Sequence, residues 1–240
     1  MPQSSQRWPS YTATIERIVA HAADIRSLFL RLPDGVRFHF SPGQFISLSL
    51  PLAGQNVTRP YTLASSPDQP GPLEIVLNLV PGGLGSAYLF GRAVGEELTF
   101  TGPFGLFTLE RRPGCEAIFV AERTAIAPIR PMIRRALTAP AGAPMRLLHG
   151  AEHEAELIYQ AEFRALATAH PEFQFAPLLP RQGESLSGLL LKEVRERYVE
   201  GDQRRDRQFY LCGVGSSVLE MRQLLRDNGY PRQQIHYEKW

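Results

Sequence analysis

Residues 59–67 read RPYTLASSP, and this segment is the starting point for interpreting the strands and loops on either side of it. Alternate side chains of a strand lie on one face, so Arg59 and Tyr61 would share a face, with the Thr62 hydroxyl close by. Arginine can bind a phosphate, tyrosine can lie against a flat ring, and threonine can hydrogen-bond a ring heteroatom. Together these residues suit a flavin nucleotide, although the same spacing also describes an ordinary strand with one solvated face.

Short strands are predicted on both sides of this segment, at 12–20, 25–32, 40–51 and 73–80, with turns rich in Pro and Gly between them. About six short strands with such turns indicate an antiparallel β-barrel. Residues 81–89, PGGLGSAYL, carry glycines that let the backbone approach a ligand, and Gly85 and Ser86 can open a helix whose free N–H groups face an anion. Ser86 would serve equally well as the cap of an ordinary helix.

The second half of the chain has a different pattern. Residues 110–116, ERRPGCE, are polar and contain Pro and Gly, so they are predicted to link two domains, 1–109 and 110–240. Beyond them, apolar strands alternate with amphipathic helices. The strands are expected at 117–121, 145–151, 173–180 and 208–215, and the helices at 129–137, 155–170, 186–199 and 217–229. This alternation predicts an α/β dinucleotide-binding domain with a parallel sheet.

The motifs resemble those of the ferredoxin-NADP reductase superfamily of flavoproteins over nearly the whole chain. The family's flavin-binding strand reads Arg, any residue, Tyr, then Ser or Thr, as Arg59 to Thr62 do. TFTGPFGLFTL, residues 99–109, resembles its closing strands, and FYLCGVGSSVLEM, residues 209–221, resembles its strand ending in Cys and Gly before a helix. The resemblance implies an FAD-binding β-barrel domain, an NAD(P)-binding α/β domain, and an NAD(P)H-dependent flavin oxidoreductase of the ferredoxin or flavodoxin reductase type.

The resemblance also implies the site residues. Thr62, Cys212, Glu238 and Trp240 are expected at the reacting rings, with Cys212 beside the nicotinamide and Trp240 stacked over the flavin as a gate. Without the motif, Cys212 would be read as a buried structural cysteine. Nucleotide binding is expected from Arg59, Pro60, Tyr61, Thr62, Asn78, Leu79, Val80, Leu84, Gly85, Ser86, Arg123, Thr124, Ala125, Arg181, Cys212 and Gly213.

One turn departs from the family pattern. Relatives have Gly, Gly, Thr, Gly, Ile, Ala, Pro, whereas this chain has ERTAIAP at 122–128, so Glu122 and Arg123 replace two glycines. If those positions hold left-handed backbone angles, each side chain costs about 1–2 kcal/mol. Glu122 would also place a carboxylate near a phosphate. Two interpretations follow: a weakened or lost nicotinamide site, or a shifted loop in which Arg123 binds the phosphate.

The nucleotide and the electron acceptor are left open. Arg181 could favour the 2′-phosphate of NADPH, whereas Glu152 points towards NADH. The expected route passes a hydride from NAD(P)H to FAD and then single electrons to a ferredoxin, a flavodoxin or an oxygenase component; free flavin, quinone or ferric iron are further candidates. The alternative is a flavin-binding electron-transfer subunit with a degenerate nicotinamide site, reduced by a protein partner. A scaffold without any cofactor is disfavoured by the flavin motifs.

Composition argues against several other classes of protein. A net charge of +2 argues against a nucleic-acid binder, which needs a concentrated basic surface. The 2 cysteines cannot ligate an iron–sulfur cluster and the 6 histidines show no metal spacing, so no metal is expected. No apolar run approaches the ~20 residues of a transmembrane segment, and no secretion leader is recognised, so a cytoplasmic location is expected.

Overall fold

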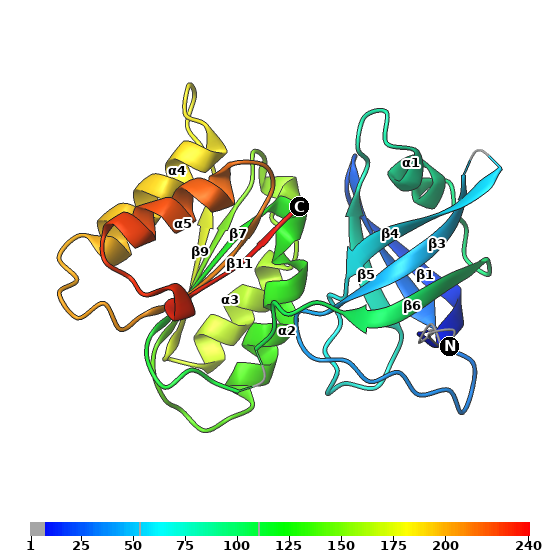
Figure 1. Cartoon of the computed structure of the whole chain (residues 1–240), viewed down its shortest axis with the longest axis horizontal. Helices are drawn as coiled ribbons and strands as arrows, with labels where there is room; N and C mark the ends of the chain where they lie inside the picture. The colour runs from blue at the N-terminus through cyan, green and yellow to red at the C-terminus, as the bar shows by residue number, and fades with distance from the viewer. Residues whose placement is uncertain (1–7, 53, 110) are drawn as a thin grey trace, which may run out of the picture.

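The computed structural model describes residues 8–52, 54–109 and 111–240, which form two domains that lie side by side (Figure 1). The first seven residues of the predicted barrel domain and the first residue of the predicted linker, at 110, lie outside the described residues. The chain passes from the antiparallel sheet to the parallel sheet between Phe104 and Ala117.

The first domain is built on six antiparallel strands, as the alternating pattern predicts. They are β1 (Ser10–Ala22), β2 (Ile25–Arg31), β3 (Phe45–Leu52), β4 (Gln55–Thr62), β5 (Leu73–Asn78) and β6 (Glu97–Phe104), in the sheet order β4-β3-β6-β1-β2-β5. A bridge between Leu63, just after β4, and Ile75 in β5 joins the two edge strands and closes the barrel. The short helix α1 (Leu84–Phe90) lies at one end of the barrel, where Leu89 enters its core (Figure 1).

The second domain has a five-stranded parallel sheet in the order β11-β10-β7-β8-β9. Its strands are β7 (Ala117–Glu122), β8 (Met145–Gly150), β9 (Phe173–Leu178), β10 (Gln208–Gly213) and β11 (Ile235–Lys239). Helices α2 (Ile126–Leu137) and α3 (Gln160–Ala169) cover one face, and α4 (Leu186–Val194) and α5 (Ser217–Asp227) cover the other (Figure 1). Phe119 packs in the core with α2 and α3, whereas Val120 packs with α4 and α5. Because both faces are covered, β7 is apolar almost throughout.

Several predicted elements have different ends in the structure, and three of them differ most. The helix expected over 155–170 begins only at Gln160, because Tyr159 has a left-handed backbone with φ 61° and follows a separate short turn at Glu154–Glu156. The strand expected from residue 40 begins at Phe45. The helix expected over 186–199 ends as an α-helix at Val194 and continues as a π-helical turn, Arg195–Val199. In the part of the chain that the structure describes, every helix falls short of the length and apolarity that crossing a membrane requires.

The two domains share a hydrophobic core and a buried polar contact. Ile25, Ala64 and Val76 of the barrel belong to the same buried cluster as residues of α2. Beside them, the buried carboxylate of Glu74 accepts hydrogen bonds from Arg130 (2.7 Å) and from the Tyr159 hydroxyl (2.7 Å). This contact holds α2 against β5, so the surfaces that face one another between the domains have a defined arrangement.

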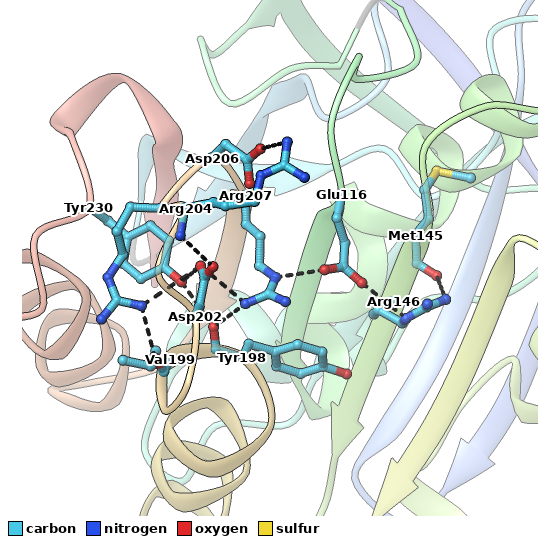
Figure 2. Close-up of polar contacts among 11 residues, drawn as sticks. Glu116, Met145, Arg146, Tyr198, Val199, Asp202, Arg204, Asp206, Arg207 and Tyr230 are labelled. Carbon is cyan, nitrogen blue, oxygen red and sulfur yellow. Dashed lines mark hydrogen bonds and ion pairs between the residues drawn. The ribbon is translucent and has the colours of Figure 1, made fainter.

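A second polar network ties the amino-terminal edge of the parallel sheet (Figure 2). Arg207, which precedes β10, donates to Glu116 (2.6 Å) and to the Tyr198 carbonyl (2.6 Å), and it forms an ion pair with Asp202 (3.1 Å). The Tyr230 hydroxyl donates to the same carbonyl (2.9 Å). These side chains therefore hold together the amino-terminal ends of the strands. The carboxyl ends of the strands, where α/β sheets bind ligands, lie on the opposite side of the domain.

Candidate active site

A cavity of about 470 Å³ opens between the two domains, within the size range of small-molecule sites. Its barrel side is formed by residues of β4, β5 and the start of α1: Arg59, Pro60, Tyr61, Thr62, Val76, Leu77, Asn78, Val80, Gly83, Leu84, Gly85 and Ser86. Its other side is formed by Thr124, Ala125, Ala127, Pro128, Val214 and Trp240. Twelve of the predicted site residues are therefore brought to one cavity.

Two polar atoms in the cavity wall lack a partner. Among the described residues, Thr62 Oγ1 and Asn78 Oδ1 are buried and have no hydrogen-bond partner. Buried polar groups are normally hydrogen-bonded, so these two atoms are candidates to bind the polar atoms of a ligand in the cavity. Val76 and Leu77 line the same wall and were missed by the sequence analysis, because an apolar strand residue gives no sign of facing a ligand.

Arg59 belongs to β4, and its side chain runs close to the start of α1. Within the described part of the chain, its exposed guanidinium makes one hydrogen bond, to the Thr58 carbonyl (2.9 Å), and no ion pair. A Cβ at Gly85 would lie 3.3 Å from Arg59 Cγ, so glycine there lets the arginine run close along the helix. The guanidinium is thus available for an anion at the edge of the cavity.

The Ser86 hydroxyl has a structural role in the loop before α1, and its predicted contact with the nucleotide stays a prediction. The hydroxyl accepts a hydrogen bond from the Val80 N–H (3.0 Å) and donates to the Gly83 carbonyl (3.0 Å). Ser86 lies inside the first turn of α1, whose N-cap is Gly83, so the alternative interpretation of Ser86 as a helix cap is wrong. The hydroxyl closes the loop 80–86, and the loop backbone forms the cavity wall.

Cys212, Glu238 and Trp240 come together at the ends of β10 and β11. Cys212 lies opposite Glu238 in the parallel register. The Trp240 indole donates to Cys212 Sγ (3.2 Å), and its ring lines the cavity. Burial, with the neighbouring Glu238 carboxylate, raises the pKa of the Cys212 thiol strongly, so the group is a neutral thiol. Burial also raises the pKa of Glu238 to about 7, and its Oε2 has no partner among the described residues.

Six predicted residues do not line this cavity: Leu79, Arg123, Arg181, Cys212, Gly213 and Glu238. Leu79 is 39% exposed and its N–H donates to the Asp24 carbonyl. Arg181 is exposed in the turn after β9, where its N–H donates to Glu184. The proposed contacts of these residues with a nucleotide stay predictions.

The turn at 122–125 differs in part from expectation. Arg123 has a left-handed backbone, with φ 48°, whereas Glu122 is extended, with φ −108°. The expected strain is therefore found at Arg123 alone. The Arg123 guanidinium donates to Asp24 of the barrel (2.5 Å) and to Glu156 (2.9 Å). Its carbonyl accepts a hydrogen bond from Nε2 of His149, a residue whose pKa burial lowers to about 4.

Comparison with known proteins identifies the family. The oxidoreductase FAD-binding domain model matches residues 12–109, and the oxidoreductase NAD-binding domain model matches residues 119–222. The chain is 36% identical over 225 residues to ferredoxin–NADP reductase B of Sorangium cellulosum, covering 90% of this chain and 91% of that protein. The chain belongs to the ferredoxin–NADP reductase family. It is an oxidoreductase with an FAD-binding and an NAD-binding domain.

Other members of the ferredoxin–NADP reductase family are also similar. The glycine betaine monooxygenase reductase subunit of Pseudomonas aeruginosa is 27% identical over 249 residues, covering 99% of this chain and 66% of the relative. A cytochrome P450 reductase from Amycolatopsis superposes with a TM-score of 0.83 and 28% identity, over 96% of this chain and 69% of that one. A ferredoxin NADP+ reductase from Neisseria gonorrhoeae, with a TM-score of 0.79 and 22% identity over 96% and 98% of the two chains, shares the fold.

The residues present fit FAD. Thr62 and Asn78 offer unpaired polar atoms to a ring, Tyr61 offers a flat face, and Arg59 offers a free guanidinium to a phosphate. The carboxyl ends of the parallel strands, where the nicotinamide nucleotide is expected, are less open. The Glu122 carboxylate, at the end of β7, accepts hydrogen bonds from the Val214 N–H (3.0 Å) and the Ser217 hydroxyl (2.8 Å), which leaves that part of the sheet edge filled.

Proposed function

We propose that this protein takes electrons from NAD(P)H through FAD and passes them one at a time to an external electron carrier. The observation that carries the proposal is the cavity between the domains, where Thr62 and Asn78 present unpaired polar atoms from the barrel and Trp240 lies on the opposite wall. A ligand in this cavity touches both domains, as a flavin that exchanges hydride with a nicotinamide must. Bound FAD supplies the redox chemistry, taking two electrons with a hydride and giving them up singly.

The side chains have separate roles in this proposal. Arg59 would bind the flavin phosphate, Tyr61 would lie against the ring system, and Thr62 and Asn78 would hydrogen-bond the ring heteroatoms. Trp240, which lines the cavity, would cover bound FAD and would have to move aside for the nicotinamide.

Cys212 and Glu238 have roles at the edge of the sheet. Cys212, a neutral thiol, positions the nicotinamide ring and does not attack it. Glu238, whose pKa lies near neutrality, holds a proton close to the reacting rings and can exchange it with solvent.

The acceptor is proposed to be a ferredoxin, a flavodoxin or the oxygenase component of a multicomponent system. The names of the relatives support this choice, because one is a ferredoxin–NADP reductase and others are reductase components of monooxygenases. The described residues include no cluster of His, Cys, Asp and Glu that could hold a metal.

The test of this proposal is carrier reduction by the FAD-loaded protein. With NADPH or NADH present, we expect steady reduction of an added ferredoxin or flavodoxin, and none when the protein or the nucleotide is left out. Reduction of ferricyanide without reduction of any protein carrier would contradict the proposed class of acceptor.

We also propose that the boundary between the two domains lies at 109/110 and that the protein is cytoplasmic. The free thiols Cys115 and Cys212 support the cytoplasmic location.

A further inference from the structure

The parallel sheet has a topological switch point between β7 and β10. From β7 the chain proceeds through β8 and β9 towards one edge, and then returns to add β10 and β11 on the other side of β7. In open α/β sheets, the crevice outside the carboxyl ends of the two strands at this point is where nucleotides bind. The donors that face such a ligand are commonly the N–H groups at the start of the following helix, here α5.

The crevice between β7 and β10 is bridged by one side chain of the protein itself. Glu122 is the last residue of β7, and its Oε2 accepts hydrogen bonds from the Val214 N–H and the Ser217 hydroxyl, at the end of β10 and the start of α5. A Cβ on Gly213 would lie 2.6 Å from the same oxygen, so the carboxylate presses against the strand end. Two donors that an anionic ligand could use, the Val214 N–H just before α5 and the Ser217 hydroxyl in its first turn, are therefore already occupied.

This buried carboxylate has no cation to balance it among the described residues. Glu122 is 7% exposed and its hydrogen-bond partners are neutral. The neighbouring Arg123 turns away to Asp24 and Glu156. Burial raises the pKa of Glu122, the hydrogen bonds from Val214 and Ser217 lower it, and the acidic Glu152 and Glu220 raise it further, so that the net shift is upward. A second anion in this crevice would meet direct electrostatic repulsion.

We propose that Glu122 is an internal competitor of the nicotinamide nucleotide: its carboxylate occupies the switch-point crevice, and the nucleotide's pyrophosphate binds only after the carboxylate has left. The proposal rests on the proposed function, because it assumes that NAD(P)H binds at this sheet edge. It assigns Glu122 a role in nucleotide affinity and none in the hydride transfer itself. Glu122 stands where the family pattern has a glycine, and its side chain thus weakens nucleotide binding without abolishing it.

The test is a calorimetric titration of the FAD-loaded protein with NAD⁺ and NADP⁺, which bind without reducing the flavin. Glu122→Ala frees two hydrogen-bond donors and removes a buried negative charge, so Kd should fall at least about tenfold. Glu122→Gln still fills the crevice but carries no charge, so its gain should be smaller. Unfolding midpoints and FAD content establish that each variant is folded; if Glu122→Ala fails this check, Glu122→Gln decides, and unchanged affinity in it overturns the proposal.

A matched control variant separates the effect of a carboxylate that fills the crevice from the effect of a negative charge nearby. Glu220→Gln removes an exposed carboxylate from the first turn of the same helix without vacating the crevice, so its Kd should change less than about twofold. An equal gain in Glu220→Gln and Glu122→Ala overturns the proposal. Wild-type affinity equal to that of Glu122→Ala overturns it while leaving the proposed function intact. If neither the wild type nor any folded variant binds either nucleotide, the proposed function fails together with the inference.

Discussion

The indole nitrogen of Trp240 lies 3.2 Å from the sulfur of Cys212 and donates a hydrogen bond to it. The backbone reinforces this contact, since the Trp240 N–H donates to the Gly213 carbonyl (3.0 Å). The residue is therefore tied to the sheet edge, and its ring forms part of the cavity wall. The gating role proposed for Trp240 therefore requires that its hydrogen bond to Cys212 break.

Replacing Trp240 should reveal whether its ring covers the flavin. An indole in contact with a flavin quenches flavin fluorescence by electron transfer, so Trp240→Ala should bind FAD with clearly brighter emission than the wild type. Trp240→Phe keeps an aromatic ring on the cavity but cannot donate to Cys212, and its weaker quenching should place it between the two. Equal emission from the wild type and Trp240→Ala, at equal FAD occupancy, would show that the ring lies elsewhere.

Removing the Thr62 hydroxyl, which has no hydrogen-bond partner among the described residues, should stabilise the FAD-free protein and weaken FAD binding. In the FAD-free protein, Thr62→Val removes a buried polar group without a partner, so the free energy of unfolding should rise by about 1 kcal/mol. With FAD, the lost hydrogen bond should raise Kd about fivefold. Denaturant unfolding and FAD titration measure the two effects. Thr99→Val, at an exposed threonine of β6, is the control and should leave FAD binding unchanged; unchanged FAD affinity in Thr62→Val would contradict its role.

The pKa of Glu238 predicts a pH dependence of stability. Burial raises this pKa from 4.5 to about 7, so between these values the folded protein holds a proton that the unfolded chain has lost. Stability therefore falls as pH rises through this window, by at most about 3 kcal/mol. Urea unfolding at pH 5 and pH 8 should show a smaller fall for Glu238→Gln than for the wild type. Identical falls in the two proteins would mean that Glu238 titrates normally.

The contact between Arg130 and Glu74 should couple the two domains. Their side chains are 13% and 5% exposed, so Arg130→Met leaves a buried carboxylate without its cation and should destabilise the protein by about 3 kcal/mol. Glu74→Leu alone should also destabilise it, whereas the double variant should be more stable than the sum of the single effects implies. The measurement is a double-mutant cycle of unfolding free energies, and strict additivity would show that the pair is not coupled.

Much of the fold could be predicted from local patterns. The strands of the barrel alternate in polarity and β7 is a continuous apolar run, so both sheets are visible in the sequence. The strand β11 was not predicted, because IHYEK has one buried residue in five and resembles an exposed tail. The start of α3 was misplaced because Tyr159 adopts a left-handed backbone, which its residue type does not suggest.

The candidate site was predictable where it depends on a motif and unpredictable where it depends on distant pairs. Arg59, Tyr61 and Thr62 lie on one strand, and their shared position in the cavity follows from that strand. By contrast, Glu122 meets Val214 and Ser217 across 92 and 95 residues, and Arg123 meets Asp24 across 99. The order of the strands in the parallel sheet brings Glu122 to Val214 and Ser217, and the packing of the two domains brings Arg123 to Asp24.

The most direct test of the central claim is anaerobic stopped-flow mixing of the FAD-loaded protein with NADH or NADPH, following the flavin absorbance. We predict that at least one nucleotide bleaches the flavin within the mixing experiment and that the faster one identifies the physiological donor. A flavin that neither nucleotide reduces, but that dithionite does, would contradict the claim. The protein would then be a flavin-binding electron-transfer subunit reduced by a partner protein.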